Sequence, residues 1–304
     1  MKLNANNTYI YPLILCFLSL SCAINSEQGK LQLKDGQRSL LTYNAGYTSS
    51  PFPDKPFYGR SGYIHPLYSP SGKTITAEFP KSHPHQHALM FAWTSAVIEG
   101  RKVDFWNSHK KQGRVEHVET ISASADKILV KLQYIDLTAG KETPVINETW
   151  EITRIPHEEL NIFDLKSTQS CISQTPVKIG KYHYGGMCIR ANDTWVNKVD
   201  ISTDQGLNRQ AANNSRPKWI AMSGIIDGAI CGVAAMGHPS NFRSPQPIRV
   251  HPKKPYFCFA PMILGDFEIK KGQAYISTFR FVTYDEKLNK EQLDKVYEDF
   301  ANKY

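Results

Sequence analysis

The sequence lacks long apolar runs, apart from one short stretch close to its N-terminus. A membrane-spanning helix needs about 18 or more apolar residues, so this absence excludes a multi-span membrane protein. The sequence also lacks a strong excess of one charge, because its 304 residues include 36 Lys and Arg against 28 Asp and Glu. With 41% hydrophobic residues, the composition excludes a disordered chain and predicts a globular protein with a large core.

Several chemical motifs are absent as well. No nucleophile elbow, phosphate-binding loop, dinucleotide fingerprint or His-Glu-x-x-His zinc motif occurs. Basic residues occur in short pairs without interleaved aromatic residues, so we expect no nucleic-acid partner. The cysteines after Cys22 have neither zinc-ribbon nor redox spacing, and we expect small buried thiols at Cys171, Cys188, Cys231 and Cys258.

Residues 1–21 are typical of an export signal, because one basic residue, Lys2, precedes the short apolar run. The stretch that ends at Cys22 resembles a relaxed lipobox, with Ser19 where a leucine is usual. We therefore expect 1–21 to be a signal peptide and 22–40 a tether that is lipid-anchored at Cys22. The protein would then be periplasmic and would touch the membrane only through its lipid. A plainly cleaved signal and an uncleaved anchor remain alternatives.

Alternating apolar and polar residues predict β-strands between about residue 60 and residue 284. The expected strands are 88–98, 115–121, 127–135, 145–155, 160–167, 219–226, 229–236 and 274–284. Turn-forming residues separate them, and no alternation of strands with helices is visible. The sequence therefore predicts a mainly β protein, with one large antiparallel β-sandwich domain over 41–304.

One helix is predicted, at the C-terminus over 289–300. Leu293, Val296, Tyr297 and Phe300 follow the spacing of one helix face. Asn289, at the start, precedes a glutamine by three residues, as in a capping box.

The densest candidate site is Ser82-His83-Pro84-His85-Gln86-His87. On an extended backbone its three histidines would point to one face. Three interpretations stay open: a divalent-metal site formed by His83, His85 and His87, a metal-free acid–base or sugar site, and a polar loop.

Two further groups suit carbohydrate chemistry. Asp104-Phe105-Trp106 would place an aromatic face and a carboxylate against a sugar, or would be core residues with a capped turn. His183, Tyr184 and Arg190 would supply a base, an acid and a charge clamp, or would be strand residues beside a Gly-Gly bend.

Other candidates lie in loops and at strand ends. His238 and Asn241 follow the apolar strand 229–236, and the segment Arg249-Val250-His251-Pro252 comes soon after. Arg60 and His65 are expected to face the same cleft, and the alternative is a turn and a strand without a functional role.

Taken as a set, these motifs resemble a bacterial family of exported proteins, over about residues 40–303. The family often carries the label "methane oxygenase PmoA" and otherwise only an unknown-function domain name. The resemblance rests on His65-Pro66-Leu67-Tyr68-Ser69-Pro70-Ser71-Gly72, His83-Pro84-His85, Phe91-Ala92-Trp93, Asp104-Phe105-Trp106, Tyr184-Gly185-Gly186 and His238-Pro239-Ser240-Asn241. Members often have His-His-Arg-Gly where this chain has His85-Gln86-His87-Ala88.

This resemblance implies a β-sandwich in the style of the galactose mutarotase supersandwich, and a role in glycan degradation. A membrane methane oxygenase needs several long apolar spans, so the methane label does not fit this chain.

We therefore expect an exported carbohydrate-active protein, a lyase or hydrolase that acts on glycosides or oligosaccharides. The catalytic candidates are His85, His87, His183, Tyr184 and His238. The substrate-binding candidates are Arg60, His65, Trp93, Asp104, Trp106, Arg190 and Asn241. The alternatives are a non-catalytic glycan-binding lipoprotein and a structural envelope protein without a cleft.

Overall fold

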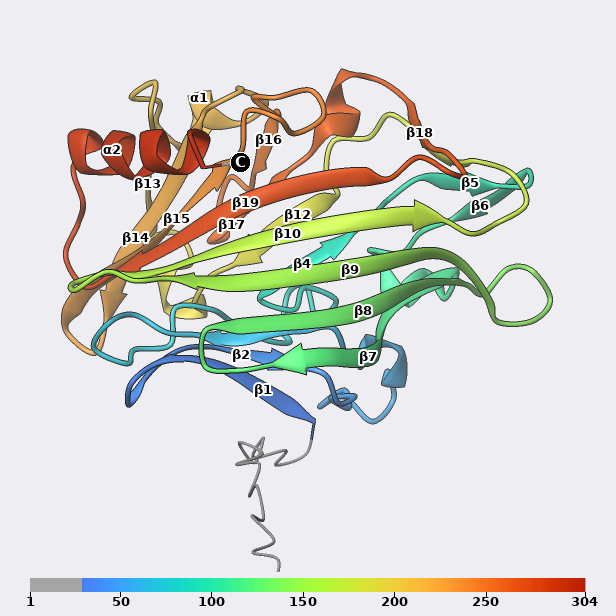
Figure 1. Ribbon diagram of the computed structural model, residues 1–304, viewed down its shortest axis with the longest axis horizontal. Coiled ribbons are helices and arrows are strands. Elements are labelled where there is room, and N and C mark those ends of the chain that lie inside the picture. The colour runs from blue at the N-terminus through green and yellow to red at the C-terminus, as the bar shows by residue number, and fades with distance from the viewer. Residues whose placement is uncertain (1–28, 304) are drawn as a thin grey trace, which may run out of the picture.

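The computed structural model describes residues 29–303, which form three antiparallel sheets (Figure 1). The expected signal peptide and Cys22 lie outside the described residues. No helix within 29–303 is both long and apolar enough to cross a membrane.

Two large sheets form the sandwich. The eight-stranded sheet contains, in spatial order, β13 (Asp200–Thr203), β14 (Trp219–Ile226), β15 (Ala229–Gly237), β19 (Tyr275–Tyr284), β10 (Asn161–Cys171), β9 (Thr143–Ile155), β8 (Lys127–Asp136) and β7 (Gly113–Ala123). The seven-stranded sheet contains β1 (Lys30–Asp35), β2 (Arg38–Asn44), β3 (Tyr63–Leu67), β4 (Leu89–Ala92), β12 (Gly186–Arg190), β17 (Tyr256–Phe259) and β16 (Ile248–Val250).

Shorter elements complete the chain. A four-stranded sheet contains β18 (Phe267–Ile269), β11 (Val177–Ile179), β5 (Ala96–Ile98) and β6 (Arg101–Val103). The helices are α1 (Arg209–Ala212) and α2 (Lys290–Ala301), with the 3-10 turns η1 (Pro56–Tyr58), η2 (Ser108–Lys110), η3 (Asp193–Trp195) and η4 (Pro261–Leu264).

The main core lies between the two large sheets, and side-chain alternation explains which residues enter it. In β19, Phe279 and Phe281 join the main core. Val282 belongs instead to a second apolar cluster beside α2, and the Arg280 guanidinium lies 4.9 Å from the ring centroid of Phe300 in that helix. The period of two in the sequence therefore describes a strand that is covered on both faces.

Helix α2 confirms the prediction for the C-terminus. The Asn289 side chain accepts a hydrogen bond from the backbone of Gln292, whose side chain accepts one from the backbone of Asn289, so the capping box is present. Leu293, Tyr297 and Phe300 are buried against the eight-stranded sheet. The mainly β, antiparallel sandwich with a C-terminal helix is thus confirmed.

One domain boundary and one strand differ from the expectation. Residues 30–40, assigned to a tether, lie in β1 and β2, because Leu31, Leu33 and Leu40 are buried in the core. The strand expected over 88–98 is two strands, β4 and β5, since the chain bends at Ser95, where φ is +52°. The four described cysteines are buried and unpaired, as expected.

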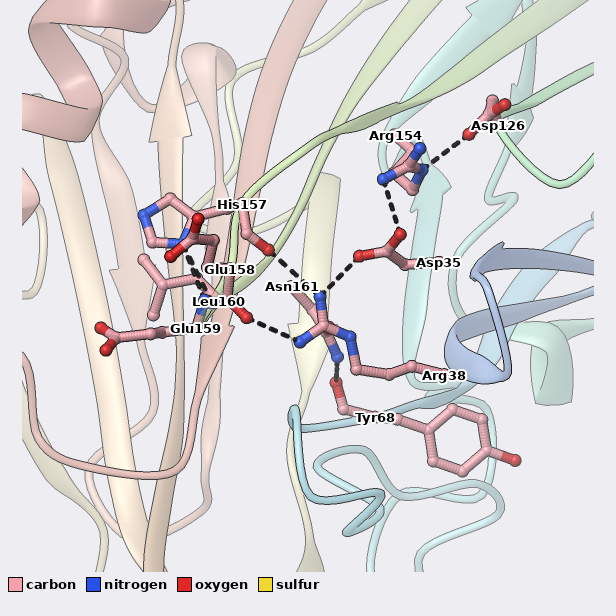
Figure 2. A network of polar contacts seen from close by, with 10 residues as sticks. All are labelled: Asp35, Arg38, Tyr68, Asp126, Arg154, His157, Glu158, Glu159, Leu160 and Asn161. Carbon is pink, nitrogen blue, oxygen red and sulfur yellow. Dashed lines mark hydrogen bonds and ion pairs between the residues drawn. The ribbon is translucent and has the colours of Figure 1, made fainter.

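A group of ion pairs joins the β1–β2 hairpin to the eight-stranded sheet (Figure 2). Arg38 donates to Asp35 at 2.8 Å and to the carbonyl oxygens of His157 and Glu158 in the β9–β10 turn. Arg154 of β9 lies 3.1 Å from Asp35 and pairs with Asp126 at 2.7 Å. We call Asp35, Arg38, Asp126 and Arg154 the Arg38–Arg154 network.

Candidate functional site

The segment 82–87 is turned, so the expected extended backbone is wrong. The backbone N–H of His83 donates to the carbonyl of Pro80, and that of Gln86 donates to the carbonyl of His83. Turns of this kind suit a segment in which prolines fix φ at two nearby positions. The turns still place the rings of His83 and His85 5.8 Å apart.

Two more histidines extend this pair into a row. The ring centroid of His251, from the β16–β17 turn, lies 5.6 Å from that of His83. The ring centroid of His109, in η2, lies 5.8 Å from that of His85. Three separate segments therefore contribute one row of four imidazoles.

This row lines a pocket of about 360 Å³, which we call the histidine pocket. His183 is the fifth histidine in its wall, and the remaining lining residues are Gln86, Trp106, Asn107, Tyr184, Arg249 and Tyr256. No Asp or Glu belongs to this lining among the described residues.

Burial in the pocket keeps His85, His183 and His251 neutral near pH 7. Burial, helped by neighbouring His83 and His109, lowers the pKa of His85 to about 3. Burial is also the main reason that the pKa of His251 falls to about 4. Burial and then the charge of Arg249 lower the pKa of His183. Neutral imidazoles can accept protons, so these histidines are bases rather than cations, and Arg249 is the cation of the lining.

Asp104 orients the pocket from behind. Its carboxylate accepts hydrogen bonds from the backbone of Trp106, from the backbone and side chain of Asn107, and from Lys110 Nζ at 2.7 Å. The Asn107 amide in turn hydrogen bonds the Tyr184 hydroxyl at 3.0 Å. Asp104 is therefore placed to position Tyr184 through Asn107.

The phenol of Tyr184 is held protonated. Burial is the main cause that raises its pKa, although the hydrogen bond to Asn107 lowers it in part. Its ring lies 5.7 Å from that of Trp106, in the same wall of the pocket. A protonated phenol at neutral pH is a proton donor.

Gly186, directly after Tyr184-Gly185, lets the strand that follows Tyr184 pack against β17. Its φ is +92°, and a Cβ atom there would lie 2.2 Å from the carbonyl oxygen of Phe259. Only glycine fits a backbone approach this close.

His87 does not join the row of histidines. It is buried, its Nδ1 lies 4.0 Å from Glu78 Oε1, and its ring packs on Tyr63 and Phe79. The expected metal triad with His83 and His85 is therefore not assembled, because the turned backbone sends His87 to another side. Within residues 29–303, no three His, Cys, Asp or Glu side chains are grouped so that they could hold a metal ion.

Two tryptophans that were expected to contact the sugar are almost fully buried. Trp93 is 0% exposed and donates its indole N–H to Gln169 at 2.7 Å, so the expectation that it contacts substrate is wrong. Trp106 is 2% exposed, but it contributes to the wall of the histidine pocket.

Arg190 and His65 have structural partners. Arg190 is buried, pairs with Asp193 and donates to Gln86 Oε1 at 3.4 Å, so it stands behind the pocket rather than in it. His65 contacts Thr76 Oγ1 through Nδ1 at 3.0 Å and is not part of the lining.

The loop after β15 lies outside the histidine pocket. The ring of His238 packs 5.1 Å from that of Phe300 in α2, and its Nδ1 contacts Ser240 at 2.7 Å. Asn241 exchanges two hydrogen bonds with the backbone of Thr278. Neither residue lines the histidine pocket, so the expectation that His238 completes the site is wrong.

Some pocket residues had little or no signal in the sequence. His109 follows the Asp104-Phe105-Trp106 group by three positions, and this closeness in sequence to a candidate group is the one signal that indicates a role for it. Arg249 and His251 appeared beside His238 in the sequence, but the sheet places them with His83 instead.

The fold and the site together define an antiparallel β-sandwich protein with a histidine-lined pocket. The chain belongs to DUF6807, a family of unknown function, whose model matches residues 30–298. No curated protein matches it.

Solved structures show a distant likeness in fold. A galactose mutarotase related enzyme from Lactobacillus acidophilus is 10% identical, with 85% of this chain and 100% of that chain covered and a TM-score of 0.42. A putative aldose 1-epimerase from Escherichia coli K12 is 9% identical, with 84% and 99% covered and a TM-score of 0.42. The heparan sulfate lyase HepC from Pedobacter heparinus is 7% identical, with 82% and 33% covered and a TM-score of 0.36. At these values the likeness carries no argument about the ligand.

Proposed function

We propose that this protein is a carbohydrate lyase that cleaves acidic oligosaccharides by β-elimination in the histidine pocket. One observation carries the proposal: the pocket combines five histidines, two tyrosines and an arginine, and the described lining contains no carboxylate.

The lack of carboxylates favours elimination over hydrolysis. Most glycoside hydrolases use two carboxyl groups, about 5 to 9.5 Å apart, on either side of the bond. Elimination beside a carboxylate needs a base, a proton donor and a cation that neutralises the acid group. The histidine pocket contains these three groups.

His85 is the base in this mechanism and Tyr184 is the acid. His85 removes the proton from the carbon next to the sugar carboxylate, and the electron pair forms a carbon–carbon double bond. The neighbouring carbon–oxygen bond breaks, and the leaving oxygen takes the proton of the Tyr184 hydroxyl. The lowered pKa of His85 keeps a lone pair available, and the raised pKa of Tyr184 keeps its proton in place.

Arg249 binds the sugar carboxylate. Its Nη1 donates to Asn213 Oδ1 at 2.9 Å, and no carboxylate in the described chain forms an ion pair with it. A half-buried guanidinium with free donors suits bidentate binding of a carboxylate.

We also propose that the protein acts outside the cytoplasm, because residues 1–21 resemble an export signal and end before Cys22. Expression of the full chain in a Gram-negative host with labelled palmitate tests it. We expect the label on the wild type and none on Cys22→Ala, and equal labelling of both overturns the lipid anchor.

The enzymatic proposal is tested by incubating the protein with oligomers of galacturonate, of mannuronate and of glucuronate-containing glycans. We expect one of them to yield an unsaturated product, seen by its ultraviolet absorbance. His85→Ala and Tyr184→Phe remove that activity, whereas His157→Ala, a histidine outside the pocket, retains it. Binding without any new double bond or reducing end contradicts the proposal and supports the glycan-binding alternative.

A further inference from the structure

A second pocket, of about 170 Å³, lies on the other side of the wall formed by His85 and Trp106. Both residues line both pockets. The second pocket also contains Arg60 and Lys111, and we call it the arginine pocket.

Arg60 has no carboxylate partner in the described chain. It is 8% exposed, and its guanidinium donates only to Met90 Sδ at 3.4 Å and to the carbonyl of Phe91 at 3.2 Å. Its Nε has no hydrogen-bond partner. A buried cation without a counter-charge is costly, and an anion that enters the pocket would offset that cost.

One buried acid, Glu148, acts on Arg60 through its charge without forming an ion pair with it. Glu148 accepts hydrogen bonds from Ser167 at 2.5 Å and from Gln169 at 3.0 Å, and it forms no ion pair with Arg60. Burial raises the pKa of Glu148, which favours its neutral form. No carboxylate in the described chain is therefore bonded to the Arg60 guanidinium, which leaves it available to an anionic ligand.

Lys111 adds a second unpaired cation at the same pocket. It is exposed and its φ is +54°, in the left-handed region, and its Nζ lies 5.1 Å from the ring centroid of Phe57. Arg114 and Glu116 also line the pocket, but they pair with each other, and Arg114 pairs with Glu142 as well.

The walls of the arginine pocket are aromatic. Tyr47, Phe57 and Tyr58 line it, and Gly59 brings the chain so close to Tyr47 that a Cβ would lie 2.1 Å from the Tyr47 hydroxyl. Aromatic walls pack well on the C–H face of a sugar ring, while the two cations require an anionic substituent.

We propose that the arginine pocket is a second subsite, which binds another acidic sugar unit of the same ligand with its anionic group toward Arg60 and Lys111. This inference rests on the proposed function and extends it. The bond to be cleaved would cross the wall at His85 and Trp106. The substrate class would then be a glycan with acidic units on both sides of that bond.

The test is a calorimetric titration with sodium glucuronate and with sodium galacturonate, using glucose as the neutral match. We expect two uronate equivalents for the wild type and weak or no binding of glucose. Lys111→Gln should lose one equivalent, with binding at least about fivefold weaker at that site. Arg249→Gln should lose the other equivalent, and Lys271→Gln, an exposed lysine elsewhere, should bind as the wild type does.

Arg60→Met provides a second variant that does not depend on Lys111. It should lose the same equivalent as Lys111→Gln, and its melting temperature should equal or exceed that of the wild type, because an uncompensated buried charge is removed. Unchanged binding by both Lys111→Gln and Arg60→Met overturns the subsite. If only the Arg249-dependent equivalent exists, the proposed function stands and this inference fails. If only the Lys111-dependent equivalent exists, the histidine pocket is not the carboxylate site.

Discussion

In the Arg38–Arg154 network both guanidinium groups have a carboxylate within 3.1 Å, whereas no described Asp or Glu lines the histidine pocket. The network matches two arginines with two aspartates, and its contacts join two parts of the fold (Figure 2). The pocket holds neutral bases and the unpaired cation Arg249. The difference teaches that charges paired with an opposite charge support structure. Charges without such a partner in a concave site mark where a ligand is bound.

The largest expected effect separates the two regions by activity. His85→Ala should lower turnover about 10²- to 10⁴-fold, the usual contribution of an acid–base group. Its melting temperature should stay near that of the wild type, because His85 is not bonded to a structural partner of opposite charge. Initial rates and thermal unfolding check this, and a rate within threefold of the wild type would remove His85 from the mechanism.

A smaller effect is expected from the residue that orients Tyr184. Asp104→Asn removes the ion pair with Lys110 and should lower the free energy of unfolding by about 1 to 3 kcal/mol. Turnover should fall roughly tenfold at unchanged KM, since Tyr184 is displaced through Asn107. Adding Tyr184→Phe to Asp104→Asn should then cost less than Tyr184→Phe alone in the wild type. Fully additive effects contradict the positioning role.

The pH dependence of stability should come from the pocket rather than the network. The pKa of His85 is near its usual value in the unfolded chain and about 3 in the folded one, so the unfolded state binds more protons as the pH falls. Stability should therefore decrease from about pH 6.5 downward, by up to about 1.4 kcal/mol per pH unit. His251 acts in the same direction with a smaller effect, because solvent screens it more.

Denaturant unfolding at a series of pH values measures this slope. His85→Asn should flatten it. An equal slope in the wild type and in His85→Asn would show that other groups govern the acid sensitivity.

The smallest effect is expected from the network. Asp35→Asn removes carboxylate contacts to Arg38 and to Arg154, both at a partly exposed edge. The loss should be about 1 kcal/mol or less and should vanish at high salt, with turnover unchanged. A change in turnover would show that the two regions are coupled.

Local patterns in the sequence predicted the elements better than they predicted the site. The spacing of Leu293, Tyr297 and Phe300 and the capping pair at Asn289 are local signals, and α2 begins and ends within one residue of its expected bounds. The strand 219–226 has the bounds that its apolar residues predicted.

The site depends on long-range pairing, which one sequence does not display. His251 meets His83 because β16 and β17 pair at the edge of a sheet that also contains β4 and β12. His238 has the same residue type and a similar loop, yet it faces α2. The prediction of an extended backbone over 82–87 was wrong for a different reason. Proline is compatible with both a turned and an extended backbone, and the chain adopts the turns, which separate His87 from His85.

The backbone contact at Gly186 bears on how this gene can vary over time. Every missense change there adds at least a methyl group where 2.2 Å separates the Cβ position from a carbonyl oxygen. Selection should therefore remove such alleles even in lineages whose ligand has changed, while the rings around the pocket are replaced. A collection of related genes should encode glycine at this position throughout, beside a pocket whose residues differ from member to member. That glycine would align diverged members when the histidines no longer do.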